Sequence, residues 1–186
     1  MSIQIVFETH SISTDNERGL ATGWLPGELS ETGRELAREL GRRRRGEPIA
    51  CVFPSDLRRA AETAELAFAD AGVPIYPDAR LRECNYGDWN GMPVAQLDAE
   101  RARHLDEPFP NGESYRQAVA RVADFLDELG RGWDGQNVIL IGHSATRWAL
   151  EHLLEGTPLE QLVCAPFAWQ PGWRYVLSPP TTRQWR

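Results

Sequence analysis

The stretch IQIVFETH, residues 3–10, decides the fold of this 186-residue chain. A short, β-branched apolar run that ends at polar residues is typical of a buried strand in a parallel sheet. A second run of this kind, VILI at residues 138–141, is followed by Gly142 and His143. The two runs therefore predict two buried strands, each with a histidine just beyond its carboxyl end.

His10 and His143 are consequently the first candidates for functional residues. The carboxyl ends of parallel strands meet at one edge of an open α/β sheet, and ligands bind in the crevice outside that edge. A histidine after a strand can also be no more than a hydrogen-bonded turn residue with ordinary protonation near neutral pH. The choice between these two interpretations depends on the rest of the chain.

Strand and helix signals alternate along the whole sequence. Strands are predicted at residues 3–7, 49–53, 73–76, 137–141 and 172–177. Helices are predicted at residues 31–44, 57–71, 94–105, 114–129 and 144–154. This alternation predicts an α/β fold, a three-layer αβα sandwich with a mostly parallel central sheet and helices on both faces.

The size of the chain fits one domain over residues 1–186, large enough to bury a core without disulfides. Its formal net charge of -7 argues against nucleic acid as the main partner. The run Arg42-Arg43-Arg44-Arg45 is the local exception. Cations at the end of the first helix complement its dipole, so this run is expected to be a solvated cap rather than a partner-binding patch.

Nothing in the sequence points to export or to a membrane. The first strand begins after two residues, without the basic and apolar regions of a signal peptide. No apolar run approaches the roughly 20 residues of a membrane span. The cysteines, Cys51, Cys84 and Cys164, are odd in number and lack metal-ligand spacing, which predicts a cytoplasmic protein with reduced thiols. From Pro179 onward we expect a loose tail.

Seven short motifs carry a resemblance to a known family. They are ETHS (8–11), LSETG (29–33), SDLRRA (55–60), LRE (81–83), YGDWNG (86–91), PNGES (110–114) and HS (143–144). Each motif is weak alone, but their order and spacing cover nearly the whole chain. The chain resembles the histidine phosphatase superfamily, the phosphoglycerate mutase-like enzymes.

The resemblance implies a phosphohistidine mechanism and a role for five residues. His10 would be the nucleophile, transiently phosphorylated, and Arg59 would clamp the phosphate with its planar guanidinium. His143 would donate to a phosphate oxygen, and Glu83 would be the general acid and later the base that activates water. Asn16 would also touch the phosphoryl group. No metal ion or cofactor is implied, because two histidines without a third ligand fall short of a zinc site.

Surface positions would explain some of these residues without any catalytic role. Arg59 could be a solvated arginine near the start of a helix. Glu83 could pair with Arg80 or Arg82 in a surface loop, an interaction worth only about 0 to 1 kcal/mol. One shared site is the better explanation, because five surface accidents in the order of one family are less plausible.

Three substitutions in the expected phosphate pocket depart from the family pattern. Thr9 stands where the family has arginine, and Ser11 and Ser144 stand where it has glycine. A charged hydrogen bond contributes about 1.5 to 3 kcal/mol, so Thr9 predicts a rate deficit of about one or two decades. Arg147, four residues after His143 on one helix face, could supply the missing charge or face solvent. Both serine hydroxyls could donate hydrogen bonds to the substrate.

These observations predict a phosphatase that hydrolyses a small-molecule phosphomonoester through a phosphohistidine on His10. The family's lid segment, about residues 78–111, is short here, which favours water as the acceptor. A phosphoglycerate mutase-like phosphotransferase is the alternative enzyme. A catalytically silent or repurposed member that binds an anionic ligand is the alternative from another class. The expected partner is a small phosphorylated metabolite, and a homodimer is a candidate assembly.

Overall fold

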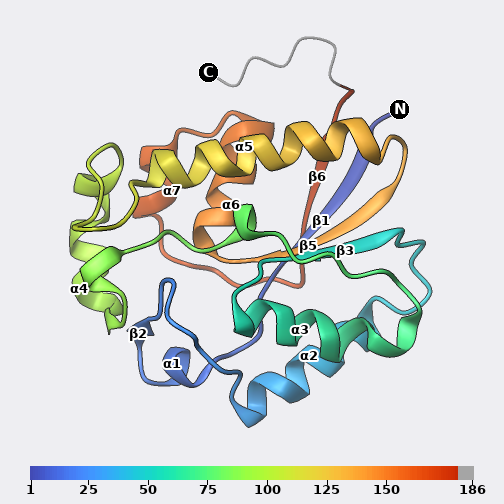
Figure 1. Cartoon of the computed structure of the whole chain (residues 1–186), viewed down its shortest axis with the longest axis horizontal. Coiled ribbons are helices and arrows are strands. Elements are labelled where there is room, and N and C mark those ends of the chain that lie inside the picture. Colours follow the sequence, from blue (N-terminus) through green and yellow to red (C-terminus); the bar gives the residue numbers. More distant parts are fainter. Residues whose placement is uncertain (180–186) are drawn as a thin grey trace.

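The computed structural model describes residues 1–179, which form a four-stranded sheet between helices (Figure 1). Its strands are β1 (Ile3–Thr9), β3 (Cys51–Pro54), β5 (Asn137–Gly142) and β6 (Trp173–Leu177), in the spatial order β3-β5-β1-β6. β3, β5 and β1 run parallel, whereas β6 pairs antiparallel with β1. The carboxyl ends of the three parallel strands therefore meet at one edge of the sheet, as the sequence predicts.

Two pairs of helices cover the faces of this sheet. α2 (Glu31–Arg43) and α3 (Arg58–Phe68) lie on one face, below the sheet in Figure 1. α5 (Tyr115–Gly132) and α6 (Ser144–Leu150) lie on the other face. Each pair packs its apolar stripe onto the strands, which produces one buried cluster on either side. The expected three-layer αβα sandwich is confirmed.

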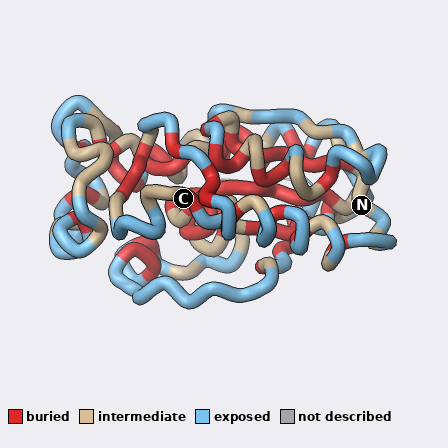
Figure 2. Tube along the Cα trace, turned by 90° about the horizontal axis from the view of Figure 1, so that it is seen from below, coloured by how far each residue is buried: buried red, intermediate tan, exposed pale blue. Residues whose placement is uncertain are grey.

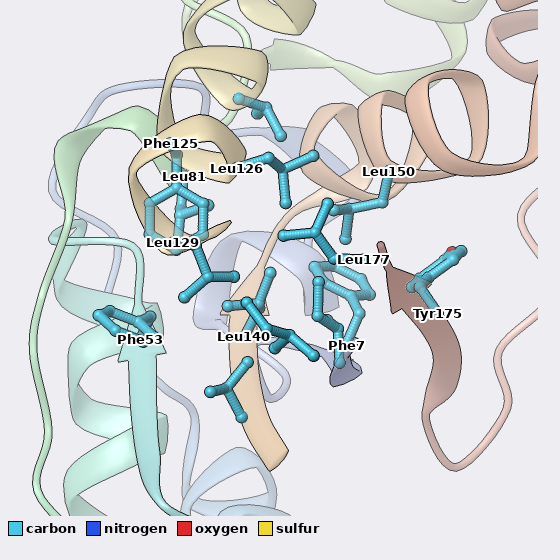
Figure 3. Packing of buried hydrophobic residues seen from close by; sticks show 14 of the residues in the cluster. Phe7, Phe53, Leu81, Phe125, Leu126, Leu129, Leu140, Leu150, Tyr175 and Leu177 are labelled. Atoms are coloured by element: carbon cyan, nitrogen blue, oxygen red, sulfur yellow. The ribbon is translucent and has the colours of Figure 1, made fainter. Parts of the chain in front are cut away.

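β1 is buried on both faces because its apolar side chains alternate between the two helix layers. Phe7 packs into the cluster on the α5 face, where Figure 3 shows it beside Leu140 and Leu177. Val6 packs into the cluster on the α2 face. Figure 2 shows a buried centre surrounded by exposed loops. The strand that leads to His10 is thus fixed from both sides.

Shorter elements connect these layers. They are α1 (Thr14–Glu17), β2 (Leu20–Ala21), β4 (Met92–Pro93), α4 (Val94–Glu100), α7 (Leu159–Cys164), the 3-10 turns Ala69–Ala71, Ala79–Leu81, Gly87–Trp89 and Arg101–His104, and the π-helical turn Glu151–Glu155. β2 and β4 form a second, two-stranded sheet, which joins the loop after β1 to the expected lid. The lid packs with α5, α6 and α7 around a third buried cluster, to which it contributes Tyr86, Leu97 and Phe109.

The strand predicted at residues 73–76 is wrong. This segment makes a single bridge to β3, between Ile75 and Val52. Pro74 lacks the N–H that would bond to the carbonyl oxygen of Ala50, and Pro54 of β3 lacks the N–H that would bond to that of Tyr76, so the ladder is not completed on either side of the bridge.

Three predicted helices also change character along their length. The helix predicted at 57–71 is α3 followed by the 3-10 turn Ala69–Ala71, and the helix predicted at 94–105 is α4 followed by the 3-10 turn Arg101–His104. The helix predicted at 144–154 becomes π-helical at Glu151. The tail expected after Pro179 lies outside the described residues. Within residues 1–179, no helix has the length and apolar character needed to cross a membrane.

The arginines at the end of α2 correct one more expectation. Arg44 is 5% exposed and donates from Nε and Nη2 to Glu8, a carboxylate of β1 that is 2% exposed. Arg43 also donates to Glu8. The solvated cap is therefore wrong for Arg44, because the buried charge of Glu8 requires a partner. Arg44 donates to the carbonyl oxygen of Pro171 as well, which ties the segment before β6 to β1 and α2.

Candidate active site

One cavity, of about 670 Å³, opens at the carboxyl edge of the sheet. Its wall contains His10, Arg59, Glu83 and His143, so the structure brings these four predicted residues together. His10 follows β1, Arg59 lies in the first turn of the helix after β3, and His143 links β5 to α6. Three of the four side chains meet here because each follows a parallel strand of the same sheet.

His10 presents a free nitrogen to the cavity. Its Nδ1 lies 2.7 Å from the carbonyl oxygen of Ser11. A carbonyl can only accept, so Nδ1 carries the hydrogen and Nε2 keeps its lone pair. Burial lowers the pKa of His10 to about 3, and the positive charge of Arg59 adds to this shift. The imidazole is therefore neutral at physiological pH and suited to nucleophilic attack.

His143, which is 1% exposed, has the opposite tautomer. Its Nδ1 lies 3.3 Å from Nη2 of Arg59, and a guanidinium can only donate, so Nε2 of His143 carries the hydrogen. Burial, with the Arg59 charge, holds the pKa of His143 well below its usual value. The buried Nε2–H has no hydrogen-bond partner among residues 1–179. Such a donor costs about 1 to 3 kcal/mol, which a ligand oxygen would offset.

The two imidazole rings lie 5.0 Å apart, measured between centroids. One ring offers a lone pair and the other an N–H, which are the two functions that an attacked phosphoryl group needs from its surroundings. Arg59, 2% exposed, adds a cation whose Nη2 is held by the carbonyl oxygen of Gly23 at 2.8 Å. Burial lowers the pKa of Arg59, but a guanidinium stays charged in proteins.

Glu83 is held at the start of α6 by backbone donors. Its Oε1 accepts from the N–H of Cys84 at 2.8 Å and from that of Ala145 at 3.2 Å. Its Oε2 accepts from the N–H of Ser144 at 3.2 Å. These bonds fix the carboxyl group at the cavity wall, where it can exchange a proton with a bound ligand or water.

Arg121, which lies outside the seven motifs, positions the Glu83 segment. It lies in α5 and donates to the carbonyl oxygens of Arg80, Arg82 and Glu83, each at 2.8 Å. Glu113 accepts from Arg121 at 2.8 and 2.9 Å. Glu113 belongs to the motif PNGES. An arginine eight residues after this glutamate, on the predicted helix that follows, is the sequence signal that could have revealed the Glu113–Arg121 ion pair.

The other predicted substrate-binding residues lie at the same cavity, with one exception described below. The four that line it are Thr9, Ser11, Asn16 and Ser144. The hydroxyl of Ser11 donates to the carbonyl oxygen of Gly33 at 2.6 Å, so its expected donation to a substrate is wrong. The Oδ1 of Asn16 accepts from Ser13 in a capping box, which leaves its amide nitrogen as the donor for a ligand.

Arg147 is the exception, and neither alternative left open by the sequence holds, because it lies outside the cavity lining and is only 9% exposed. Its guanidinium lies over the ring of Trp173, 5.2 Å from the centroid, and 5.9 Å from that of Phe167. Glu151, one helical turn later, is 3.6 Å away. These partners keep Arg147 out of the cavity lining, so it does not supply the charge that Thr9 lacks.

The stability of the protein is expected to fall as the pH is lowered from about 7 to about 4. His10 and His143 have lowered pKa values in the folded state, whereas unfolded histidines titrate near pH 6.5. Below that pH the unfolded state binds more protons, so each imidazole lowers the free energy of unfolding by up to about 1.4 kcal/mol per pH unit. Urea unfolding across this range measures the slope.

A matched pair of variants separates the histidines from the carboxylates that also titrate. His143→Gln should reduce the slope, whereas His152→Ala, outside the cavity, should retain it. The same slope in the wild type and the His143 variant would mean that folded His143 titrates normally.

Comparison with known proteins agrees with the geometry of this site. A model of the histidine phosphatase superfamily (branch 1) matches residues 5–171. The chain belongs to this superfamily. A 2,3-bisphosphoglycerate-dependent phosphoglycerate mutase of Methylobacterium sp. (strain 4-46) is 34% identical in an alignment that covers 85% of this chain and 83% of the relative.

Solved structures share the fold of this histidine phosphatase superfamily member. Bacillus stearothermophilus YhfR superposes with a TM-score of 0.79 at 27% identity, covering 91% of this chain and 88% of its own. The mycobacterial glucosyl-3-phosphoglycerate phosphatase Rv2419c superposes with a TM-score of 0.75 at 28% identity, covering 88% and 84%. The family resemblance carried by the seven motifs is therefore confirmed, in a family whose relatives are named both as mutases and as phosphatases.

Proposed function

We propose that the protein is a phosphatase that hydrolyses a small-molecule phosphomonoester through a phosphohistidine on His10. The opposite tautomers of His10 and His143 carry this proposal, because they place a nucleophilic lone pair beside a buried N–H without a partner. A superfamily relative named as a phosphatase supports the same reaction type.

In the first step, the lone pair of His10 Nε2 attacks phosphorus and the bond from phosphorus to the ester oxygen breaks. Arg59 and the Nε2–H of His143 donate to the equatorial oxygens, where negative charge is concentrated. Glu83 acts as the general acid and gives a proton to the departing oxygen, which leaves as an alcohol.

In the second step, water attacks the phosphohistidine. The Glu83 carboxylate takes a proton from the water while the oxygen bonds to phosphorus. The phosphorus–nitrogen bond breaks and its electron pair returns to Nε2 of His10. Inorganic phosphate leaves, and both side chains regain their starting states.

A phosphoglycerate mutase-like phosphotransferase is the second candidate, favoured by the name of the Methylobacterium relative. The two reactions share the first step and differ in the acceptor. Water receives the phosphoryl group in the phosphatase, whereas a second hydroxyl of a phosphoglycerate receives it in the mutase. The fate of the phosphoryl group therefore distinguishes them.

Product analysis tests the proposal directly. The protein is incubated with a panel of phosphomonoesters and, separately, with 3-phosphoglycerate plus 2,3-bisphosphoglycerate. We expect inorganic phosphate from at least one monoester and no interconversion of phosphoglycerates. Interconversion without net phosphate release would identify the mutase instead. Phosphate binding without release from any monoester would identify a catalytically silent member.

A further inference from the structure

Half of the large apolar side chains that are exposed in the described chain line the active-site cavity. Among the described residues, eight large apolar side chains are exposed. Four of them line the cavity, namely Ile12, Leu36, Phe167 and Trp169. Scattered exposed apolar residues are ordinary, but a group at one concave site marks a binding surface.

The two aromatic residues come from residues 165–172, here named the aromatic loop. This loop connects α7 to β6, and Figure 1 shows it running across to the lower end of β6. Phe7 pairs with Trp173 in the antiparallel register, so the chain just before Trp173 lies beside the end of β1. Phe167 and Trp169 therefore line the same cavity as His10, at this edge of the sheet.

The aromatic loop is held in place by buried contacts. Arg44, itself paired with Glu8, donates to the carbonyl oxygen of Pro171. Gly172 has a φ of 85°, and a Cβ there would collide with Nη2 of Arg44, so only glycine fits this close approach. The guanidinium of Arg147 lies beneath Phe167. These contacts fix the backbone of the aromatic loop as part of the cavity wall, although its two aromatic side chains are exposed.

Most charged side chains along the cavity wall are already paired. Its acidic and basic side chains, apart from the two histidines, are Glu8, Glu39, Glu83, Arg43, Arg59 and Arg101. Arg43 pairs with Glu8 at 3.2 Å, and Arg101 pairs with Asp98 at 2.8 Å. Within the described chain, Arg59 is the lining arginine that has no ion pair. One cation suits one phosphoryl group, and a second anionic group on the ligand would find no second unpaired arginine among the described lining residues.

We propose that the aromatic loop, with Leu36 and Ile12, forms a subsite for the alcohol part of the substrate and selects monoesters of bulky, uncharged, preferably aromatic alcohols. The inference rests on the proposed phosphatase function, since it assigns the leaving-group side of the same cavity. Burial of one aromatic ring system contributes about 1.5 to 3 kcal/mol, or about tenfold to a hundredfold in kcat/KM. A phosphoglycerate, with its extra carboxylate, is disfavoured.

The test compares 2-naphthylmethyl phosphate with propyl phosphate, two esters of primary alcohols that differ mainly in apolar size. In the wild type we expect kcat/KM to favour the naphthylmethyl ester by about tenfold to a hundredfold. The double variant Phe167→Ala, Trp169→Ala should reduce this ratio to within about threefold of unity. Val176→Ala, an equally exposed apolar residue outside the cavity, should keep the wild-type ratio.

A binding measurement keeps this test independent of catalysis. Calorimetric titration with 2-naphthylmethylphosphonate and propylphosphonate, which cannot be hydrolysed as esters, should show the same preference and its loss in the double variant. If no monoester is hydrolysed but this preference is present, the phosphatase proposal fails and the apolar subsite stands. If propyl phosphate is hydrolysed with the same kcat/KM as the naphthylmethyl ester, the apolar subsite is overturned and the phosphatase proposal stands.

The homodimer considered from the sequence is the rival occupant of these exposed rings. Sedimentation velocity of the wild type and the double variant distinguishes the two. A dimer that becomes monomeric in the double variant, with no change in the substrate ratio, would assign Phe167 and Trp169 to an interface and overturn the subsite. Equal sedimentation of both proteins together with a lost preference would support it.

Discussion

Replacing His10 with alanine is expected to abolish turnover of every phosphomonoester that the wild type hydrolyses. The loss in kcat should be on the order of 10⁴-fold to 10⁶-fold, as for other enzymes that lose a covalent nucleophile. The reason lies in the tautomer of His10. Its Nδ1 carries the hydrogen, so the lone pair on Nε2 is the free nucleophile at the cavity. Water attacking phosphorus directly would lack this pre-positioned partner.

Rapid quenching with a labelled substrate tests the intermediate itself. The wild type should carry label that is stable in base and released by acid, the behaviour of a phosphohistidine, and His10→Ala should carry none. His152→Ala serves as the matched control, because this histidine lies outside the cavity and bonds to the carbonyl oxygen of Thr157. Wild-type turnover by a correctly folded His10→Ala protein would end the phosphohistidine proposal.

Glu83→Gln is the second large expected effect. The amide keeps the shape of the carboxyl group but cannot protonate the departing oxygen, so a loss of about a hundredfold to ten-thousandfold is expected for alkyl esters. The loss should be much smaller for 4-nitrophenyl phosphate, whose leaving group needs no proton. An equal loss for both ester types would instead make Glu83 a positioning residue.

The environment of Glu83 calls for a stability control in this experiment. Three backbone N–H groups point at its two oxygens, and glutamine has one acceptor oxygen, so one of these donors would face an NH₂ group. The variant is therefore expected to be less stable by about 1 to 3 kcal/mol. Glu160→Gln, at an exposed position, gives the reference unfolding curve. Rates are compared below the unfolding transition of both variants.

Local sequence patterns were sufficient to predict the buried strands and the residues that directly follow them. The apolar runs of β1 and β5 predicted buried parallel strands, and the convergence of His10 and His143 follows from that one inference. The strand expected at residues 73–76 failed for a reason visible in the sequence, since Pro74 and Pro54 cannot donate to the ladder on either side of the bridge. A stricter weighting of proline would have removed it.

Charged side chains with distant partners could not be placed from the sequence. Arg44 binds Glu8, 36 residues away, and Arg147 lies over Trp173 on a strand from the end of the described chain. In both cases the tertiary partner overrides the rule that exposed arginines cap helices or extend into solvent. The tautomers of the two histidines were equally out of reach, because they depend on which oxygen or guanidinium lies against each Nδ1.

Backbone atoms, not side chains, make the hydrogen bonds that orient His10 and Glu83, and this has a consequence for the evolution of the site. His10 is oriented by the carbonyl oxygen of Ser11, and Glu83 by the N–H groups of Cys84, Ser144 and Ala145. Backbone atoms persist whichever side chain a position carries, so exchanging glycine for serine after either histidine leaves these bonds intact. Mutations can therefore accumulate around the cavity and redirect it to new substrates while the orientation of the reacting groups is inherited unchanged.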